Sequence, residues 1–157
     1  MVCAVALLAA AAKGRMNAMT IPMEYRQASV DFDRFITDAR DISGLQTTNQ
    51  AYTMVQAVLQ TFRRRLDVED AILFADVLPP VLRAIFIAEW DLEEPTSPFS
   101  GRTAMTLEVQ ALRGDHNISP DTAIADVAAA LRKNVDEAKL DRVLAHLPAG
   151  AADYWRA

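Results

Sequence analysis

The feature that most constrains the fold is a pattern that occurs twice in the chain. Ala51, Val55, Ala57 and Leu59 recur, 72 residues later, as Ala123, Val127, Ala129 and Leu131. Leu66, Asp67, Leu78 and Pro79 are matched, 69 residues later, by Val135, Asp136, Leu147 and Pro148. The offset falls from 72 to 69, so the second copy is three residues shorter than the first. The apolar residues of the shorter copy still lie on one helix face, because positions three, four and seven apart share a face. The pattern therefore indicates two copies of one helical unit.

A single unit of this kind exposes an apolar face that it cannot cover alone, so a second unit must pack against it. Two copies are too few for a solenoid, which needs about three repeats. The sequence predicts an all-α fold, a compact bundle of about eight helices built as two tandem four-helix repeats with pseudo-two-fold symmetry. We place repeat one at about residues 30–90, a linker at 91–102 and repeat two at about 103–157.

Composition fits one globular domain over residues 23–157. Hydrophobic residues make up 52% of the 157 residues and charged residues 24%, as in ordinary soluble proteins. The net charge of −5 disfavours polyanion partners, whose binding depends on basic groups that displace counterions. A single cysteine, Cys3, excludes an internal disulfide and a thiolate zinc site. We expect a cytoplasmic protein without a cofactor.

Residues 1–22 differ from the rest of the chain. The apolar run Val2–Ala12 is followed by Lys13 and Arg15. This run is shorter than the roughly 20 residues that span a bilayer, and its positive charge follows the run, whereas a signal peptide carries that charge before it. We interpret residues 1–22 as a disordered tail or a mis-assigned start. An export signal and a membrane-touching segment remain alternatives.

Helix boundaries follow from capping and breaking residues. Thr47 and Gln50 have capping-box spacing, Asp67 and Ser119 are candidate N-caps, and the Leu-Pro pairs end helices. Helices are expected at about 30–42, 48–66, 68–78, 80–90, 103–112, 120–134, 136–147 and 149–157. In the fifth of these, Leu107 and Ala111 are expected to face inward. Tyr154 and Trp155 are expected to fill the core, since aromatic residues at helical spacing pack inward.

Several short runs together resemble a known family. They are Ala51-Tyr52-Thr53-Met54-Val55, Phe62-Arg63-Arg64-Arg65-Leu66, Leu78-Pro79 followed by Val81-Leu82-Arg83, and the closing Leu147-Pro148 with Trp155. As a set they resemble the bacterial family called domain of unknown function 2267, over roughly residues 24–156. The resemblance implies an all-helical prokaryotic domain. It brings no activity, cofactor or catalytic residue to carry over.

The run Arg63-Arg64-Arg65 is the most conspicuous polar feature. Consecutive helical residues are rotated by about 100°, so the three side chains are expected to fan out. Positive charge at the end of a helix also has a structural role, because it complements the helix dipole. The following acids Asp67, Glu69 and Asp70 are expected ion-pair partners. If the protein binds an anion, the candidate residues are Arg63, Arg65 and Arg83, since guanidinium groups bind phosphate and carboxylate well.

Three functional interpretations follow, and the first is favoured. It is a non-enzymatic protein-interaction or structural module, which acts on a protein partner or as a homo-oligomer. The second is a small-anion or small-molecule binding domain with an arginine-lined groove. The third, nucleic-acid binding by a helix-turn-helix, is disfavoured by the acidic charge and the missing glycine turn. His116 and His146 lack metal-ligand spacing, so no metal site and no catalytic residue is assigned.

Overall fold

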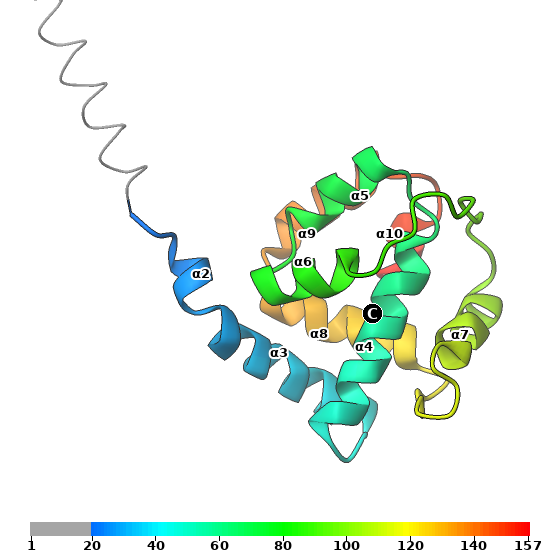
Figure 1. Ribbon diagram of the computed structural model, residues 1–157, viewed down its shortest axis with the longest axis horizontal. Coiled ribbons are helices and arrows are strands. Elements are labelled where there is room, and N and C mark those ends of the chain that lie inside the picture. The colour runs from blue at the N-terminus through cyan, green and yellow to red at the C-terminus, as the bar shows by residue number, and fades with distance from the viewer. Residues whose placement is uncertain (1–19) are drawn as a thin grey trace, which may run out of the picture.

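The computed structural model describes residues 20–157, and this part of the chain is all-helical, as the sequence predicts (Figure 1). It contains nine helices and no strand. Their bounds are α2 (Met23–Arg26), α3 (Ala28–Ser43), α4 (Thr48–Arg63), α5 (Val68–Ala75), α6 (Pro80–Ile87), α7 (Arg102–Ala111), α8 (Ala123–Asn134), α9 (Glu137–His146) and α10 (Ala151–Tyr154). Most of the predicted N-terminal tail, residues 1–19, lies outside the described residues.

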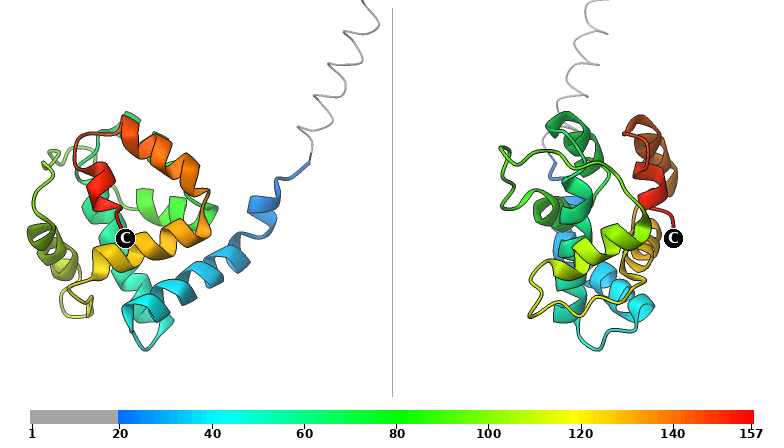
Figure 2. Two further views of the ribbon diagram at one scale, coloured as in Figure 1. Left: turned by 180° about the vertical axis from the view of Figure 1, so that it is seen from behind. Right: turned by 90° about the vertical axis from the view of Figure 1, so that its right-hand side faces the viewer.

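Two helices, α4 and α8, lie in contact at the centre of the bundle. Helix α3 packs along α8, and α7 packs against α4 (Figure 2). A helix from each half of the chain therefore covers a central helix from the other half. Helix α5 contacts α9 at one end of the molecule, while α6 and α10 contact α4 and α8 respectively. Helices that are distant in sequence therefore share one core.

Local signals explain where the helices begin. The side chain of Thr47 accepts a hydrogen bond from the Gln50 amide, and the Gln50 side chain accepts one from the Thr47 amide, which completes the expected capping box of α4. Asp67 caps α5 and Asp136 caps α9 in the same way, each through its carboxylate. Pro80 occupies the first turn of α6, where no backbone donor is needed.

An aromatic cluster fills the core at the C-terminal end of the chain. The ring of Trp155 stacks on Phe74, with centroids 5.3 Å apart and planes at 26°, and meets Phe62 edge-on at 5.3 Å. The Tyr154 hydroxyl donates a hydrogen bond of 2.7 Å to the Val58 carbonyl, so its polar end is satisfied. The prediction that Tyr154 and Trp155 fill the core is confirmed.

The segment expected to be a linker, residues 91–102, also contributes to the core. Phe99 contacts the rings of Phe62 and Tyr154. Gly150 lies directly beneath this side chain, with a φ of 103°, and a Cβ at that position would come within 2.7 Å of Phe99. The segment is thus held against the helices that it joins.

Two details differ from the sequence-based expectations. Helix α7 buries Met105 and Val109, whereas Leu107 is 62% exposed and Ala111 is also exposed. The residues of each pair are four positions apart, so helical spacing allows either pair to face inward. Packing against α4 decides which pair is buried. Ser119 does not cap α8, which begins at Ala123; the Ser119 amide instead donates to Asn117 Oδ1.

No helix within residues 20–157 is long and apolar enough to cross a membrane.

Candidate functional site

The three arginines predicted as anion ligands lie in separate environments. Arg63, at the end of α4, donates from Nη1 to the carbonyls of Phe86 and Ala88 at 2.7 and 2.9 Å. Its guanidinium carbon lies 5.4 Å from the centre of the Trp90 ring, a cation–π distance. Carbonyls at a helix end have no partner within their helix, so Arg63 stabilises the C-terminal end of α6.

Arg65 and Arg83 are also engaged by the protein. Arg65 is 3% exposed, donates to the Thr61 carbonyl at 2.7 Å, and pairs with Glu108 on α7 at 2.6 Å. Arg83 donates to one carbonyl at the C-terminal end of α5 and one just beyond it, with Nε 3.0 Å from the Ala75 oxygen and Nη2 3.0 Å from the Leu78 oxygen. The structure therefore does not bring Arg63, Arg65 and Arg83 to a common surface.

The acids expected to pair with the arginine run serve other roles, so that expectation is wrong. Asp67 accepts the amide of Asp70 as the N-cap of α5. Arg64 instead lies 3.7 Å from Glu94 in the segment after α6. Burial, together with the neighbouring carboxylates Asp67 and Glu69, raises the pKa of Asp70. Acids at the start of α5 are favoured by the helix dipole, which accounts for their presence without an arginine.

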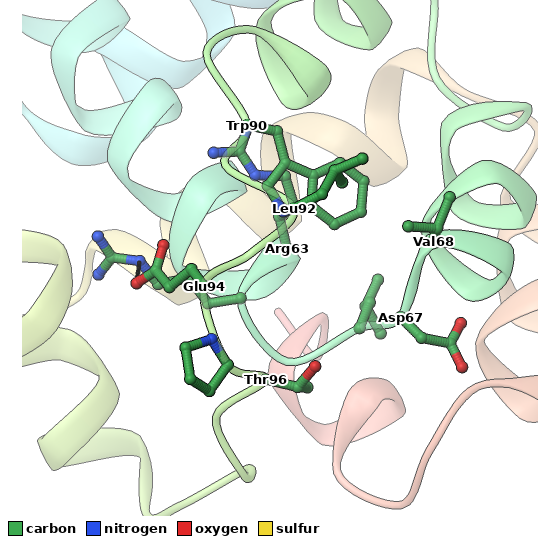
Figure 3. A pocket seen from close by; sticks show the side chains of 10 residues that line it. Arg63, Asp67, Val68, Trp90, Leu92, Glu94 and Thr96 are labelled. Atoms are coloured by element: carbon green, nitrogen blue, oxygen red, sulfur yellow. Dashed lines mark ion pairs between the residues drawn. The ribbon is translucent and has the colours of Figure 1, made fainter.

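A pocket of about 170 Å³ lies where the end of α4, the start of α5 and the segment after α6 meet (Figure 3). We call it the Arg63 pocket. Its walls are apolar at Leu66, Val68, Trp90, Leu92 and Pro95 and polar at Arg63, Arg64, Asp67, Glu94 and Thr96. Figure 3 shows the Arg63 side chain extended along Trp90. Of the three predicted anion ligands, Arg63 is the one that lines this pocket.

Arg63 is a buried charge without a carboxylate partner in the described part of the chain. The residue is 7% exposed, and its Nε, which is fully buried, donates to no protein group there. Burial lowers the pKa of its guanidinium and the nearby Arg64 lowers it further, while the negative charge of Glu94 opposes both. A buried ion is costly unless it is paired and hydrogen-bonded, so this environment is an unusual one for an arginine.

Arg132, at the end of α8, provides an internal comparison. Its Nε donates to the Trp155 carbonyl at 2.9 Å, as Arg63 donates to the Phe86 carbonyl. Unlike Arg63, it is paired with two carboxylates, Glu137 at 3.1 Å and Asp141 at 2.9 Å. These acids are the first and fifth residues of α9. The first and fifth residues of α5 are Val68 and Ile72, which are 44% and 58% exposed.

A second concave surface lies beside α5. We call it the α5–α9 groove; it has a volume of about 460 Å³ and is lined by Leu73, Lys139, Arg142, Val143 and His146. Leu73 is 47% exposed. Two apolar residues thus form part of a hollow whose other lining side chains carry, or can take up, positive charge.

Comparison with known protein families finds a match that covers most of the chain. The sequence model of one family, described as an uncharacterized conserved protein (DUF2267), matches residues 32–154. The chain belongs to the DUF2267 family. The resemblance that the sequence motifs indicate is thereby confirmed. A search of curated proteins finds no match to this chain.

Neither histidine of this DUF2267 chain belongs to a metal-binding cluster. Within residues 20–157, no group of three or more His, Cys, Asp or Glu side chains is placed to hold a metal ion. His146 lies in the last turn of α9, where its Nδ1 is 2.7 Å from the Arg142 carbonyl. A histidine at this position complements the helix dipole when protonated.

The sequence analysis missed the α5–α9 groove, although a signal was present. Helix α5 buries Ala71, Phe74 and Ala75, which already satisfy its inward face. Val68, Ile72 and Leu73 are further apolar residues that do not pack into the core, and they are exposed. A short helix with more apolar residues than its buried face requires is a sequence pattern that indicates an exposed docking face.

Proposed function

We propose that this DUF2267 chain is a non-enzymatic protein-interaction module whose α5–α9 groove binds an acidic amphipathic helix of a partner protein. The observation that supports the proposal is the composition of the groove lining. Leu73 and Val143 offer an apolar floor, and Lys139, Arg142 and His146 surround it. An amphipathic helix with carboxylates flanking its apolar stripe matches this surface in both respects.

The groove has room for apolar side chains of a partner. Its volume of about 460 Å³ falls within the range of roughly 300–1,000 Å³ typical of small-molecule and cofactor sites. Exposed apolar residues that are gathered in one place, with polar side chains at the rim, mark interaction sites. Leu73, which is 47% exposed, and Val143 supply the apolar contact area.

Charge favours a different protein over a second copy of this chain. A two-fold dimer places the same patch of both subunits face to face. Lys139 and Arg142 would then meet their own copies, and like charges across an interface are destabilising. A partner with acidic side chains gains complementarity at the same positions. We therefore assign the groove to a heterologous partner.

The proposal is tested with two designed peptides and the full chain. One is an amphipathic helical peptide of leucine and glutamate; the other has the same leucines with lysine in place of every glutamate. Fluorescence anisotropy of labelled peptide reports binding. We expect the acidic peptide to bind and the basic peptide to bind at least about tenfold more weakly, since complementary charges select partners. Added salt should weaken the acidic complex, because surface charges are screened.

A matched pair of variants locates the binding surface. Leu73→Glu places a carboxylate on the groove floor and should reduce the affinity for the acidic peptide about tenfold or more. Leu107→Glu introduces the same change at another exposed leucine, on α7, and should leave affinity unchanged. Equal binding of the two peptides, or equal loss in both variants, would rule out the groove as the docking site.

We also infer that residues 30–90 and 103–157 are copies of one helical unit, joined by residues 91–102. Equivalent contacts support this. Asp67 and Asp136 cap corresponding helices. The side chains of Arg65 and Asn134 each donate to the carbonyl four residues earlier, and each also contacts an acid, Glu108 or Asp38, on the helix packed beside it. Such pairs are expected when two copies pack about a two-fold axis.

Small-anion binding is a second candidate function, and it is favoured at Arg63 alone. Arg65 already has a carboxylate partner in Glu108. Arg83 donates to two carbonyls and lies 3.8 Å from Glu24. Arg63 combines burial, a charge without a carboxylate, and an adjoining pocket. The Arg63 pocket is therefore a candidate site distinct from the α5–α9 groove.

A further inference from the structure

We infer that the Arg63 pocket is a binding site for a single carboxylate group carried on a small apolar body. This inference rests on the second candidate function, small-anion binding at Arg63, and names its ligand class. It is independent of the helix-docking proposal, because the residues that line the pocket differ from those of the α5–α9 groove. The carboxylate would form an ion pair with Arg63, as Glu137 and Asp141 do with Arg132.

The first step of the argument concerns charge. Arg63 and Arg132 occupy the same position relative to an aspartate N-cap four residues later, and each donates to the carbonyl of the aromatic residue at the end of a short helix. Arg132 has two carboxylates and Arg63 has none. The position equivalent to Glu137 is Val68, which lines the Arg63 pocket. Asp67 and Glu94 line the pocket, but neither forms an ion pair with Arg63, and Glu94 lies 3.7 Å from Arg64 instead. A carboxylate from outside the chain can therefore form the ion pair that Arg63 lacks.

The second step concerns the free hydrogen-bond donor. Arg63 is more than nine-tenths buried, and its Nε–H donates to no group in residues 20–157. Buried donors in proteins are satisfied in the great majority of cases, and an unsatisfied one calls for an explanation. A carboxylate can accept two parallel N–H groups from one guanidinium. A bound carboxylate would thus satisfy the donor and the charge together.

The third step concerns size and polarity. The volume of about 170 Å³ is below the range of roughly 300–1,000 Å³ of typical cofactor and drug sites, so the pocket suits one side chain or a small acid. Val68, Trp90 and Leu92 form an apolar wall. Asp67 and Glu94 also line it, and their negative charge disfavours a phosphate dianion relative to a monoanion.

The test uses the unaltered full chain and NMR detection of arginine Nε–H groups. Sodium isovalerate is the small-acid probe, isovaleramide its neutral counterpart, and an acetylated, amidated Leu-Glu dipeptide stands for a protein segment. We expect the Arg63 Nε–H resonance to shift with either carboxylate, half-saturated at about 1 mM for isovalerate. The Arg132 resonance, whose Nε already donates to Trp155, serves as the internal control and should not move.

The outcomes separate the sources of the carboxylate. A shift with isovalerate alone assigns the site to small free acids, a shift with the dipeptide alone assigns it to a protein segment, and a shift with both assigns it to either. Glu94→Gln removes the competing acid in the pocket and should lower the half-saturating concentration several-fold. The inference is overturned if neither carboxylate shifts Arg63, if isovaleramide acts equally, or if Arg132 shifts to the same extent.

Discussion

At the scale of single residues, several buried or half-buried arginines in this protein donate hydrogen bonds to backbone carbonyls. Arg63 and Arg83 bind carbonyls at the ends of α6 and α5, and Arg132 binds the Trp155 carbonyl. Arg102 donates to the carbonyls of Tyr154 and Arg156 near the end of the chain. The planar guanidinium offers five donors in a fixed arrangement, which suits several unpaired carbonyls at once. Arg63 and Arg132 thereby hold the ends of the short helices α6 and α10 against the longer helices α4 and α8.

A pH dependence is expected from Asp38 on α3. Its carboxylate accepts hydrogen bonds from Lys133 at 2.7 Å and Asn134 at 2.8 Å, and these bonds lower its pKa. A pKa lower in the folded than in the unfolded chain adds stability above the unfolded value of about 3.9, and this stability is lost as the pH falls through the folded value. Asp38→Asn should therefore reduce the free energy of unfolding by about 1 kcal/mol at pH 7.

Urea unfolding at pH 7 and pH 3 measures this effect. The difference between wild type and Asp38→Asn should shrink at pH 3, because below about 3.9 the unfolded chain takes up a proton at Asp38 more readily than the folded chain does. Asp33→Asn, at an exposed position on the same helix, is the matched control and should change stability little at either pH. A difference of the same size at both pH values would show that the charge of Asp38 is not responsible.

At the scale of elements, the turn before α10 depends on a glycine. Gly150 has a φ of 103° and lies under Phe99, so a Cβ there is both strained and obstructed. Gly150→Ala should lower the free energy of unfolding by more than about 1 kcal/mol. Gly101→Ala, with no atom within 4 Å of its Cβ, should stay within about 0.5 kcal/mol of wild type. Thermal unfolding of both variants measures this, and equal melting temperatures would contradict the role given to Phe99.

Helix positions, caps and most inward-facing residues could be predicted from sequence because they depend on neighbours in the chain. Thr47 and Asp67 act as caps through residues three positions away. Contacts between distant residues could not be predicted. The partner of Arg65 is Glu108, 43 residues away, and α7 turns Val109 inward because α4 lies beside it.

The same limit applies to the candidate sites. The run of arginines is visible in the sequence, and Arg63 is one of its candidate anion ligands, but the environment of Arg63 depends on Trp90 and the segment after α6. The α5–α9 groove requires two helices that are separated by more than 60 residues. A surface formed by two such elements has no local sequence pattern, apart from the excess of apolar residues in α5.

At the scale of the whole molecule, the two halves of the chain share one core but differ in the ion pairing of an arginine near the end of the long helix α4 or α8. Helix α3 covers α8, α7 covers α4, and Trp155 stacks on Phe74. Within this common framework, one long helix ends in an arginine with two carboxylates and the other in an arginine with none. The apolar residues Val68 and Ile72 stand where the acids would be. We regard this asymmetry as the feature that turns a structural helix end into a binding site.

The most direct measurement of that claim compares the unfolding free energies of Val68→Glu and Val68→Gln in urea at pH 7. Glutamate at position 68 restores the acid that Arg132 has in Glu137, whereas glutamine has nearly the same shape without the charge. The account predicts that Val68→Glu is more stable than Val68→Gln by about 0.5–1 kcal/mol at low salt, with the gap narrowing in high salt. Equal stability, or a less stable glutamate variant, would contradict the account.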